Sequence, residues 1–247
     1  MAVSKPTIID KTPKLTKFNN GGKRFQTTKI IWHYTGKAEA KAINTINNWF
    51  NAITNGYKVN GKYLYASSNY LCDLDGTIYS YIPEDYIAYA SNSANKYSIS
   101  IECATTGSDD HYTESEYESM VQLGAYLADK YNLDPRKDFL THTDIVGKNY
   151  KICPRYFVEN PREWEKFKLD CYNKLRKQEK TKYLRTLTNV NLHNKPNFDE
   201  SSVCAVAKKG TVLTIIKEIE REGTNMYLTR AGTYITASTK YVETFEK

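Results

Sequence analysis

Three residues of types that bind metal ions through nitrogen or sulfur are spread along the sequence: His33, His142 and Cys153. Two imidazoles and one thiolate would leave a zinc ion one open coordination position, which is the arrangement of catalytic rather than structural zinc. His33 is near the end of an apolar run at residues 29–34, and His142 follows a predicted helix. For each histidine taken alone, a hydrogen-bonded core position or an inert cleft is as good an interpretation as a metal site.

Cys153 strengthens the metal hypothesis because of its neighbours. It precedes Pro154, and a residue before proline adopts an extended backbone. Such a backbone places the side chains of Lys151 and Cys153 on the same side. A nearby ammonium group favours the thiolate, which is the form of cysteine that binds zinc. The two remaining histidines, His111 and His193, are predicted to be exposed.

Glu102 is a candidate general base. Along residues 97–103 two isoleucines face one way, whereas two serines and Glu102 face the other. One interpretation is a half-exposed strand with a solvated glutamate. The other is a carboxylate directed into a cleft, where it could move a proton during hydrolysis. The pattern alone leaves both interpretations open.

The elements that would position these residues alternate between strands and helices up to about residue 175. Apolar, β-rich runs predict strands, and apolar residues at helical spacing predict helices. The predicted strands are residues 29–34, 63–74, 77–82 and 97–103, the second and third joined by an Asp-Gly turn. The predicted helices are residues 39–53, residues 113–131 with a capping box at 113–116, and a final one from residue 161. This order predicts an α/β fold with a central mixed β-sheet flanked by helices.

The length of the chain and a change in residue pattern along it predict a second domain. A chain of 247 residues suits one large domain with a smaller one appended. Residues 176–182 carry four basic side chains and one acidic side chain without apolar spacing, which is typical of a linker. Beyond them, short β-rich stretches alternate with glycine-containing turns. We therefore predict one domain at 1–175, a linker at 176–182 and a small all-β barrel or sandwich at 183–247.

Composition and charge exclude several classes of protein. No apolar run approaches about 18 residues, so membrane insertion is not expected. The first residues lack the apolar stretch of a signal peptide, so we expect synthesis in the cytoplasm without one. Five widely spaced cysteines without a Cys-x-x-Cys pair predict neither a disulfide framework nor a zinc finger. The net charge of +7 would suit a nucleic-acid binder, but no recognition motif supports that alternative.

Four motifs, in this order, resemble one enzyme family. They are Ile-Ile-Trp-His-Tyr-Thr-Gly at residues 30–36, Asn-Tyr-Leu-Cys-Asp-Leu-Asp-Gly-Thr-Ile at 69–78, Ser-Ile-Ser-Ile-Glu at 98–102, and Thr-His-Thr-Asp-Ile-Val-Gly-Lys with a following Cys-Pro at 141–154. Over roughly residues 25–172 the chain resembles the zinc-dependent N-acetylmuramoyl-L-alanine amidases of the phage endolysin and peptidoglycan-recognition type. The resemblance implies that His33, His142 and Cys153 bind Zn²⁺. It also implies that Glu102 and Lys151 are catalytic.

Two features of the matched region differ from the family pattern. Asn69 stands where a histidine is common, and Ser67 and Ser68 occupy a stretch that carries a tyrosine in some phage members. Because no tyrosine is present there, the resemblance leaves Glu102 as the base.

The tail resembles bacterial SH3-like wall-binding domains in three short motifs. They are Leu-His-Asn-Lys-Pro at residues 192–196, Val-Ala-Lys-Lys-Gly-Thr-Val at 206–212 and Tyr-Val at 241–242. This second resemblance implies a domain that binds the bacterial cell wall.

Together the resemblances imply a hydrolase that cuts the amide bond between N-acetylmuramic acid and the L-alanine of the stem peptide. The expected partner is peptidoglycan of a Gram-positive type wall, with no nucleic acid and no membrane insertion. A phage endolysin that reaches the wall after release is expected rather than a secreted or host autolysin. A non-catalytic peptidoglycan receptor on the same scaffold is the alternative, and Cys153 argues against it because such receptors typically lack this cysteine.

Overall fold

The computed structural model describes residues 3–177 and 182–246, and the chain separates between residues 178 and 179 into two compact units. Residues 178–181 of the predicted linker lie outside the described part. Regular structure reaches into the rest of that linker, because helix α7 (Pro161–Lys177) includes Arg176 and strand β11 (Lys182–Thr186) begins at Lys182. Among the described residues, no helix is long and apolar enough to cross a membrane.

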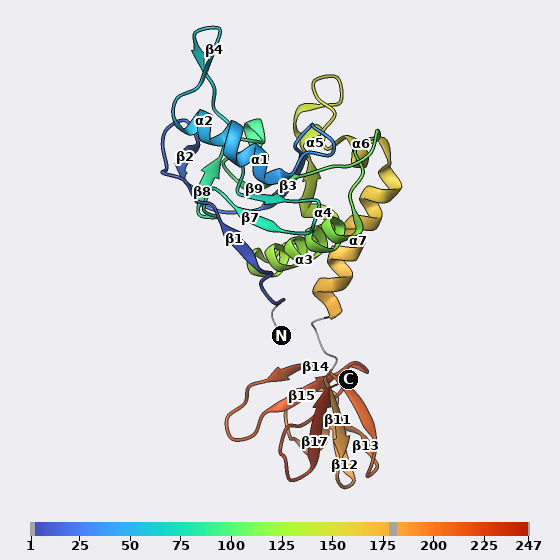
Figure 1. Ribbon diagram of the computed structural model, residues 1–247. Helices are drawn as coiled ribbons and strands as arrows, with labels where there is room; N and C mark the ends of the chain where they lie inside the picture. The colour runs from blue at the N-terminus through green and yellow to red at the C-terminus, as the bar shows by residue number, and fades with distance from the viewer. Residues whose placement is uncertain (1–2, 178–181, 247) are drawn as a thin grey trace. The chain divides into compact units, whose positions relative to one another are not determined.

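The described part of the first unit is built on a six-stranded sheet (Figure 1). In spatial order its strands are β1 (Ile8–Asp10), β7 (Ile78–Ser80), β6 (Tyr70–Cys72), β9 (Ser98–Cys103), β3 (Lys29–Tyr34) and β10 (Phe139–Thr141). Neighbouring strands run parallel except β6 and β7, which are antiparallel and joined by the predicted Asp-Gly turn. The central mixed sheet expected from the sequence is confirmed.

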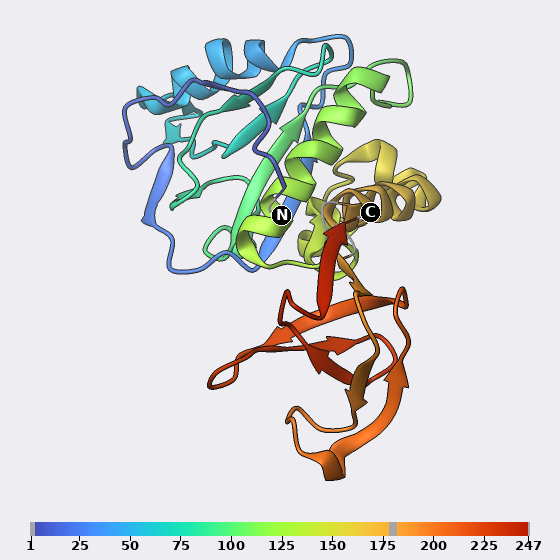
Figure 2. The ribbon, with the colours of Figure 1, turned by 90° about the horizontal axis from the view of Figure 1, so that it is seen from below.

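Helices cover both faces of this sheet (Figures 1 and 2). One face packs against α3 (Glu114–Tyr131), α6 (Arg155–Glu159) and α7, with α4 (Pro135–Asp138) beside α7. The other face packs against a helical segment made of α1 (Ala42–Asn44), the π-helical η1 (Thr45–Phe50) and α2 (Asn51–Thr54). This segment corresponds to the helix predicted at 39–53. The remaining helices of the unit are η2 (Asn92–Ala94) and α5 (His142–Val146).

Two short two-stranded ladders lie outside the main sheet. They are β2 (Asn20–Lys23) with β8 (Tyr86–Ala88), and the hairpin of β4 (Lys58–Val59) and β5 (Lys62–Tyr63). The hairpin projects beyond α2 in Figure 1.

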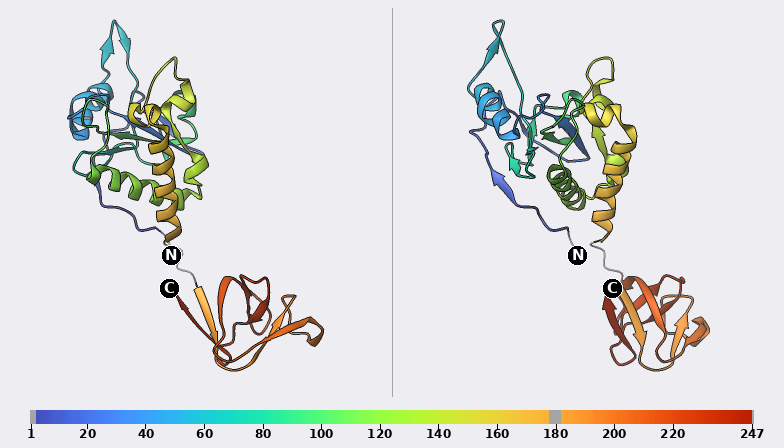
Figure 3. Two further views of the ribbon diagram at one scale, coloured as in Figure 1. Left: turned by 90° about the vertical axis from the view of Figure 1, so that its right-hand side faces the viewer. Right: turned by 45° about the vertical axis from the view of Figure 1, so that its right-hand side comes forward.

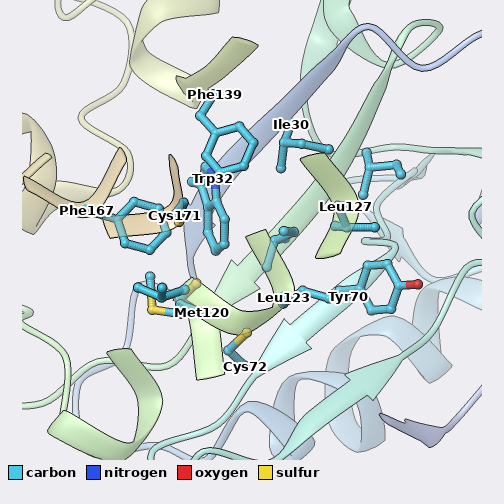
Figure 4. Close-up of a cluster of buried hydrophobic side chains, with 14 of the residues drawn as sticks. Ile30, Trp32, Tyr70, Cys72, Met120, Leu123, Leu127, Phe139, Phe167 and Cys171 are labelled. Atoms are coloured by element: carbon cyan, nitrogen blue, oxygen red, sulfur yellow. The ribbon is translucent and has the colours of Figure 1, made fainter. Parts of the chain in front are cut away.

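The core of the unit depends on the alternation of side chains along β3. Ile30 and Trp32 are fully buried against α3 and α7, together with Leu123 and Phe167 (Figure 4). The Trp32 ring lies 4.8 Å from the Phe167 ring, edge to face, and 5.9 Å from the Phe139 ring, measured between centroids. Aromatic side chains bury large apolar areas, so this cluster anchors the helices to the sheet. The same alternation directs His33 to the opposite face.

The strand predicted at residues 63–74 is wrong in its extent. Its first residue, Tyr63, belongs to the β4–β5 hairpin, and only Tyr70–Cys72 joins the main sheet. Between these elements the Ser67 hydroxyl donates to the Asn19 carbonyl and accepts the Tyr89 N–H. The Ser67 N–H also donates to the Tyr89 carbonyl at 3.1 Å, so this segment bonds to residues outside the main sheet instead of continuing β6.

The capping box predicted at the start of α3 forms only in part. Thr113 Oγ1 accepts the Glu116 N–H at 3.2 Å, but neither Glu116 carboxyl oxygen makes a hydrogen bond of normal geometry among the described residues. Burial, followed by the negative charge of nearby Asp73, raises the pKa of Glu116 to about 9. Both bonds of a capping box form instead at α5, between Thr141 and Asp144.

We expect Glu116→Gln to stabilise the first unit by about 1 kcal/mol or more at pH 8 and to have little effect at pH 5. The unfolded chain releases the Glu116 proton near pH 4.5 while the folded chain retains it. Stability of the wild type therefore falls as the pH rises from about 4.5 towards 9, and glutamine removes this dependence. The ionisable groups near the carboxyl, present in both proteins, are Asp73, Cys103 and Tyr112.

Urea unfolding followed by tryptophan fluorescence measures this effect, because Trp32, Trp49 and Trp164 all belong to the first unit. Glu118→Gln, at an exposed position of the same helix, is the matched control and should behave as the wild type. Equal pH slopes for Glu116→Gln and wild type would contradict a buried proton at Glu116.

The described part of the second unit is all-β, as the sequence predicts. Its strands, in spatial order, are β13 (Val203–Ala207), β12 (Val190–His193), β16 (Tyr234–Thr236), β15 (Met226–Thr229), β14 (Val212–Ile219), β11 and β17 (Val242–Glu246), with the 3-10 turn η3 (Glu200–Ser202) before β13. Neighbouring strands are antiparallel. A small core formed by Leu184, Val190, Ile235 and Val242 holds them together.

The prediction that His193 is exposed is wrong. His193 is buried on β12, and its Nδ1 lies 2.8 Å from the Ser202 hydroxyl. A histidine can be buried when a polar partner satisfies its ring nitrogen. His111 in the first unit does lie at the surface, with 45% of its side chain exposed.

Candidate active site

The parallel strands β3 and β10 bring the first two candidate residues together. Parallel neighbours end at the same edge of a sheet, and His33 lies at the carboxyl end of β3 while His142 directly follows β10. The two imidazole rings lie 4.7 Å apart between centroids. Cys153, in the loop before α6, places its Sγ 3.8 Å from His33 Nδ1. One donor atom from each of the three buried residues lies within 4.8 Å of the others.

Hydrogen bonds on the far side of each ring orient the two histidines. His33 Nε2 lies 3.0 Å from Ser91 Oγ, and His142 Nε2 lies 2.8 Å from Asn92 Oδ1. An amide oxygen only accepts, so Nε2 of His142 carries the hydrogen and Nδ1 keeps its lone pair. His142 Nδ1 is buried and has no hydrogen-bond partner among the described residues. A buried nitrogen with a free lone pair, aimed at a second imidazole and a thiol, fits a metal ligand.

The surroundings keep both imidazoles neutral, as metal ligands must be. Burial, the other imidazole and the charge of Lys151 lower the pKa of His33 well below its usual range. Burial and Lys151 lower the pKa of His142 to about 4. Both rings are therefore unprotonated at neutral pH and able to donate to a metal ion.

Cys153 differs from the sequence-based expectation that Lys151 favours its thiolate. Burial and the nearby Glu102 raise the pKa of Cys153 to about 12, and the opposing effect of Lys151 is smaller. Lys151 is exposed whereas Cys153 is fully buried. Solvent therefore screens the charge of the Lys151 ammonium group and weakens its effect on the Cys153 thiol. The thiol stays protonated unless a cation binds beside it. A metal ion supplies such a charge, because a coordinated thiol loses its proton.

The donor set fits zinc. Imidazole nitrogen and thiolate sulfur are the ligands that zinc prefers, and three protein ligands leave a fourth position for water or substrate. The buried and unpartnered Nδ1 of His142 is otherwise hard to explain in a folded protein.

Glu102 stands next to His33 across the sheet. The parallel ladder between β3 and β9 pairs the two residues directly, so their side chains share one face. Burial raises the pKa of Glu102 to about 7, with Lys151 opposing the shift. The structure thus favours the second interpretation of this strand, a carboxylate facing a site rather than open solvent. A carboxyl group with a pKa near neutrality can both accept and return a proton.

Lys151 is an exposed residue of the loop between α5 and Cys153. Its charge acts on His33, His142, Cys153 and Glu102, which places it electrostatically beside the cluster. Thr143 fixes the loop, since its hydroxyl donates to the Lys151 carbonyl at 2.8 Å and accepts the Cys153 N–H at 2.7 Å.

Sequence reasoning missed Ser91 and Asn92. Each lies at least 50 residues from the histidine it contacts, so no spacing pattern connects them. The one local signal is the asparagine type itself, because Asn92 has a φ of 50° and asparagine tolerates the left-handed region better than most residues. Ser91 also bonds to Ser100 of β9, which joins the supporting residues to the strand that carries Glu102.

The two departures from the family pattern lie below the site and are structural. Asn69 is buried, accepts the Ser100 N–H and donates to the Ile82 carbonyl. The Ser68 hydroxyl donates to the Ser100 carbonyl. These bonds attach the start of β6 to β9 and place no ionisable group near the cluster.

Two family models match different parts of the chain. One, described as N-acetylmuramoyl-L-alanine amidase, matches residues 23–156, more than half of the chain. It spans the residues of the metal cluster together with Glu102 and Lys151. The other, described as a domain of unknown function, matches residues 177–242.

Similar proteins agree with the first match. The N-acetylmuramoyl-L-alanine amidase BlyA of Bacillus subtilis (strain 168) is 24% identical over 275 residues, covering 93% of this chain and 71% of its own length. The catalytic domain of PlyG matches 69% of this chain and 96% of its own, with a TM-score of 0.54 and 22% identity. A mutant endolysin from Bacillus subtilis matches 67% of this chain and 98% of its own, with a TM-score of 0.52 and 20% identity. The structural matches show a shared fold for the first unit.

We expect Ser91→Ala to weaken metal binding about 10- to 100-fold without unfolding the protein. The substitution removes the hydroxyl that faces His33 Nε2, so the ring loses its orientation and part of its basicity. Competition with a chromogenic chelator measures the affinity. Ser202→Ala is the matched control, because it removes an equivalent serine–histidine contact at His193, far from the cluster in sequence. Equal metal affinity of the Ser91 variant and the wild type would show that this contact does not support the site.

Proposed function

Because the chain belongs to the N-acetylmuramoyl-L-alanine amidase family, we propose that it hydrolyses peptidoglycan at the amide bond between the lactyl group of N-acetylmuramic acid and L-alanine. The observation that carries this function is the cluster of His33, His142 and Cys153 with Glu102 paired beside His33. A buried nucleophilic serine or a phosphate-binding loop is not needed for this chemistry, since a metal site with a neighbouring base suffices for amide hydrolysis.

We propose zinc as the metal, held by His33 Nδ1, His142 Nδ1 and Cys153 Sγ. Zinc in such a site polarises a carbonyl group and lowers the pKa of a bound water to about 7. The residues around it prepare the donors: Ser91 and Asn92 orient the rings, and burial keeps the rings neutral.

Glu102 is proposed as the proton carrier. Its carboxylate accepts a proton from the water that attacks the lactyl carbonyl, and it then delivers this proton to the leaving amine of L-alanine. A pKa of about 7 suits both steps, because the group is neither too weak a base nor too weak an acid near neutral pH.

Lys151 is proposed to stabilise the negative charge that develops on the carbonyl oxygen. Its charge reaches the three buried residues of the cluster and the half-buried Glu102, and an exposed side chain can close over a bound substrate without disturbing the core.

A non-catalytic peptidoglycan receptor is the competing function on the same scaffold. Binding alone requires neither a thiol beside two imidazoles nor a carboxyl group whose pKa lies near neutrality. Cys153 and Glu102 occupy such positions here, so we favour the enzyme.

We also propose that the second unit is an SH3-like domain that binds the cell wall, of a Gram-positive type, and that the protein acts there after release as an endolysin does. Its support is the set of sequence motifs described above and the all-β architecture with its own core. The separation of the chain into two compact units allows cutting and attachment to be divided between them.

We expect Glu102→Gln to keep one zinc per chain and the wild-type fold while losing on the order of 10²-fold or more in kcat on a soluble N-acetylmuramoyl peptide. Glutamine preserves the shape of the side chain but cannot carry the proton. Elemental analysis and release of L-alanine amino groups measure the two quantities. Glu118→Gln is the control for an exposed carboxylate.

Cys153→Ser separates the metal role from the proton role, because a hydroxyl is a poor zinc ligand and the variant should lose metal and activity together. Wild-type turnover by the zinc-loaded Glu102→Gln protein would contradict the proposal that Glu102 carries the proton. Wild-type protein that contains no zinc and remains active in chelator would remove the metal assignment.

We expect a truncation ending at Lys177 to cleave the soluble substrate like the full chain but to lyse intact cells more slowly. The first unit holds the whole cluster and its own core, whereas attachment raises the effective concentration of enzyme at the wall. Residues 182–247 fused to a fluorescent reporter should label the wall. Equal lysis by both forms, together with an isolated second unit that does not bind walls, would refute the attachment role and leave the amidase untouched.

A further inference from the structure

Charge is divided unequally within the first unit. Residues 11–72 contain ten lysines and arginines against a single acidic residue, Glu39. Residues 73–175 contain eleven basic and eighteen acidic residues. Lys23 and Lys29 pair with Asp85 and Asp138, but Lys17 and Lys58 have no ion-pair partner among the described residues. The first segment therefore presents unneutralised positive charge.

An unusual run of aromatic rings accompanies this charge. Tyr89, Tyr65, Phe18 and Tyr63 follow one another with centroid distances of 5.9, 5.9 and 4.8 Å. We call these four residues the aromatic row. Tyr65 is 52% exposed and Tyr63 is 43% exposed, although large aromatic side chains usually bury most of their area. These two exposed rings flank the half-buried ring of Phe18, and exposed apolar patches of this kind mark binding surfaces.

Lys17 and Lys58 each lie over one ring of the row. Lys17 Nζ is 5.2 Å from the centre of the Phe18 ring, and Lys58 Nζ is 4.4 Å from the centre of the Tyr63 ring. Cation–π contacts hold the ammonium groups beside the rings while leaving their charge available to a ligand.

The row is held in place by the backbone beneath it. Gly56 has a φ of +87°, and a Cβ at this position would lie 3.3 Å from Phe18 and 3.4 Å from Tyr63, so both rings rest on the glycine. The hairpin turn at Asn60 and Gly61 has positive φ at both residues, which matches the twist of a tight hairpin. The surface is therefore formed before any ligand arrives, which reduces the entropy lost on binding.

The row begins close in sequence to a residue that contacts the metal cluster. Tyr89 lies two residues before Ser91, whose hydroxyl contacts His33 Nε2. From Tyr89 the rings lead outwards to the β4–β5 hairpin, which lies at the same end of the unit as α5 in Figures 1 and 3. Because α5 begins at His142, the row leads to the end of the unit that also carries this residue of the cluster.

We propose that the aromatic row is a subsite for the glycan strand of peptidoglycan, which stacks sugar rings on Tyr65 and Tyr63 while the adjoining lysines attract its carboxylates. The proposal rests on the proposed amidase function. Pyranose rings present apolar C–H faces that pack on aromatic rings, and peptidoglycan carries carboxylates on its stem peptides. Each hydrolysis adds a hydroxyl to the lactyl carbonyl carbon and a hydrogen to the amine, so the glycan also gains a lactyl carboxylate. A neutral ring surface flanked by ammonium groups complements such a strand.

The double substitution Tyr63→Ala and Tyr65→Ala tests the proposal in the full-length protein. The readout is the ratio of kcat/KM on long, solubilised peptidoglycan strands to kcat/KM on a single-sugar N-acetylmuramoyl peptide. We expect this ratio to fall on the order of tenfold, mainly through KM on the strands. The ring-preserving Tyr63→Phe and Tyr65→Phe double variant should keep the wild-type ratio. Tyr97→Ala, at a tyrosine that is 38% exposed outside the row, is the matched control.

An equal ratio in the double alanine variant and the wild type would overturn the subsite. Wild-type protein that cleaves neither substrate would instead refute the proposed amidase function, so the two failures are distinguishable. Equal folding of all variants is checked by the midpoint of tryptophan-detected unfolding.

Direct binding, measured by calorimetry with the Glu102→Gln protein, separates sugar stacking from charge. The neutral probe is a β-1,4-linked oligomer of N-acetylglucosamine, and the anionic probe is poly(glycerol phosphate). We expect the Glu102→Gln protein that also carries Tyr63→Ala and Tyr65→Ala to bind the neutral oligomer on the order of tenfold more weakly than the Glu102→Gln protein alone. Loss of poly(glycerol phosphate) binding alone, with the neutral oligomer bound as before, would assign the row to an anionic wall polymer and overturn the glycan subsite.

Discussion

The catalytic site depends on the parallel pairing of β3 with β9 on one side and β10 on the other. The first pairing aligns His33 with Glu102, and the second brings the end of β10 beside the end of β3, where the chain turns into His142. A shift of one residue in either ladder would turn a side chain to the opposite face. The aromatic core around Trp32 opposes such a shift, because moving Trp32 to the other face would remove its ring from the contacts with Phe139 and Phe167.

Burial gives this site its chemistry as well as its geometry. It keeps the imidazoles of His33 and His142 neutral, raises the pKa of Glu102 to about 7 and raises the pKa of Cys153 to about 12. Desolvation is the largest cause of all four shifts, and it disfavours charge of either sign. A metal ion held by the two imidazoles, as we propose, would favour the thiolate of Cys153.

The rest of the first unit connects this small buried site to a large polymer. Ser91 supports His33 from below, and two residues earlier Tyr89 begins the aromatic row that ends at the exposed hairpin. Two of the basic residues of the segment 11–72, Lys17 and Lys58, lie over rings of this row. In our proposal the chemistry takes place at the cluster of His33, His142 and Cys153, and the rings and ammonium groups at the surface recognise the long chain.

The sequence by itself determined the mixed sheet with its helices and the all-β second unit, because side-chain periodicity is a local property. Ordered motifs also singled out the residues for which we propose metal binding and proton transfer. The sequence could not determine the extent of the strand near Ser67, the partial cap at Glu116 or the burial of His193, since side-chain bonds from distant segments decide them. The contacts of Ser91 and Asn92 with the two histidines could not be predicted from the sequence for the same reason. The protonation of Cys153 also required the tertiary structure, because desolvation depends on everything packed around the thiol and outweighs the charge of its sequence neighbour Lys151.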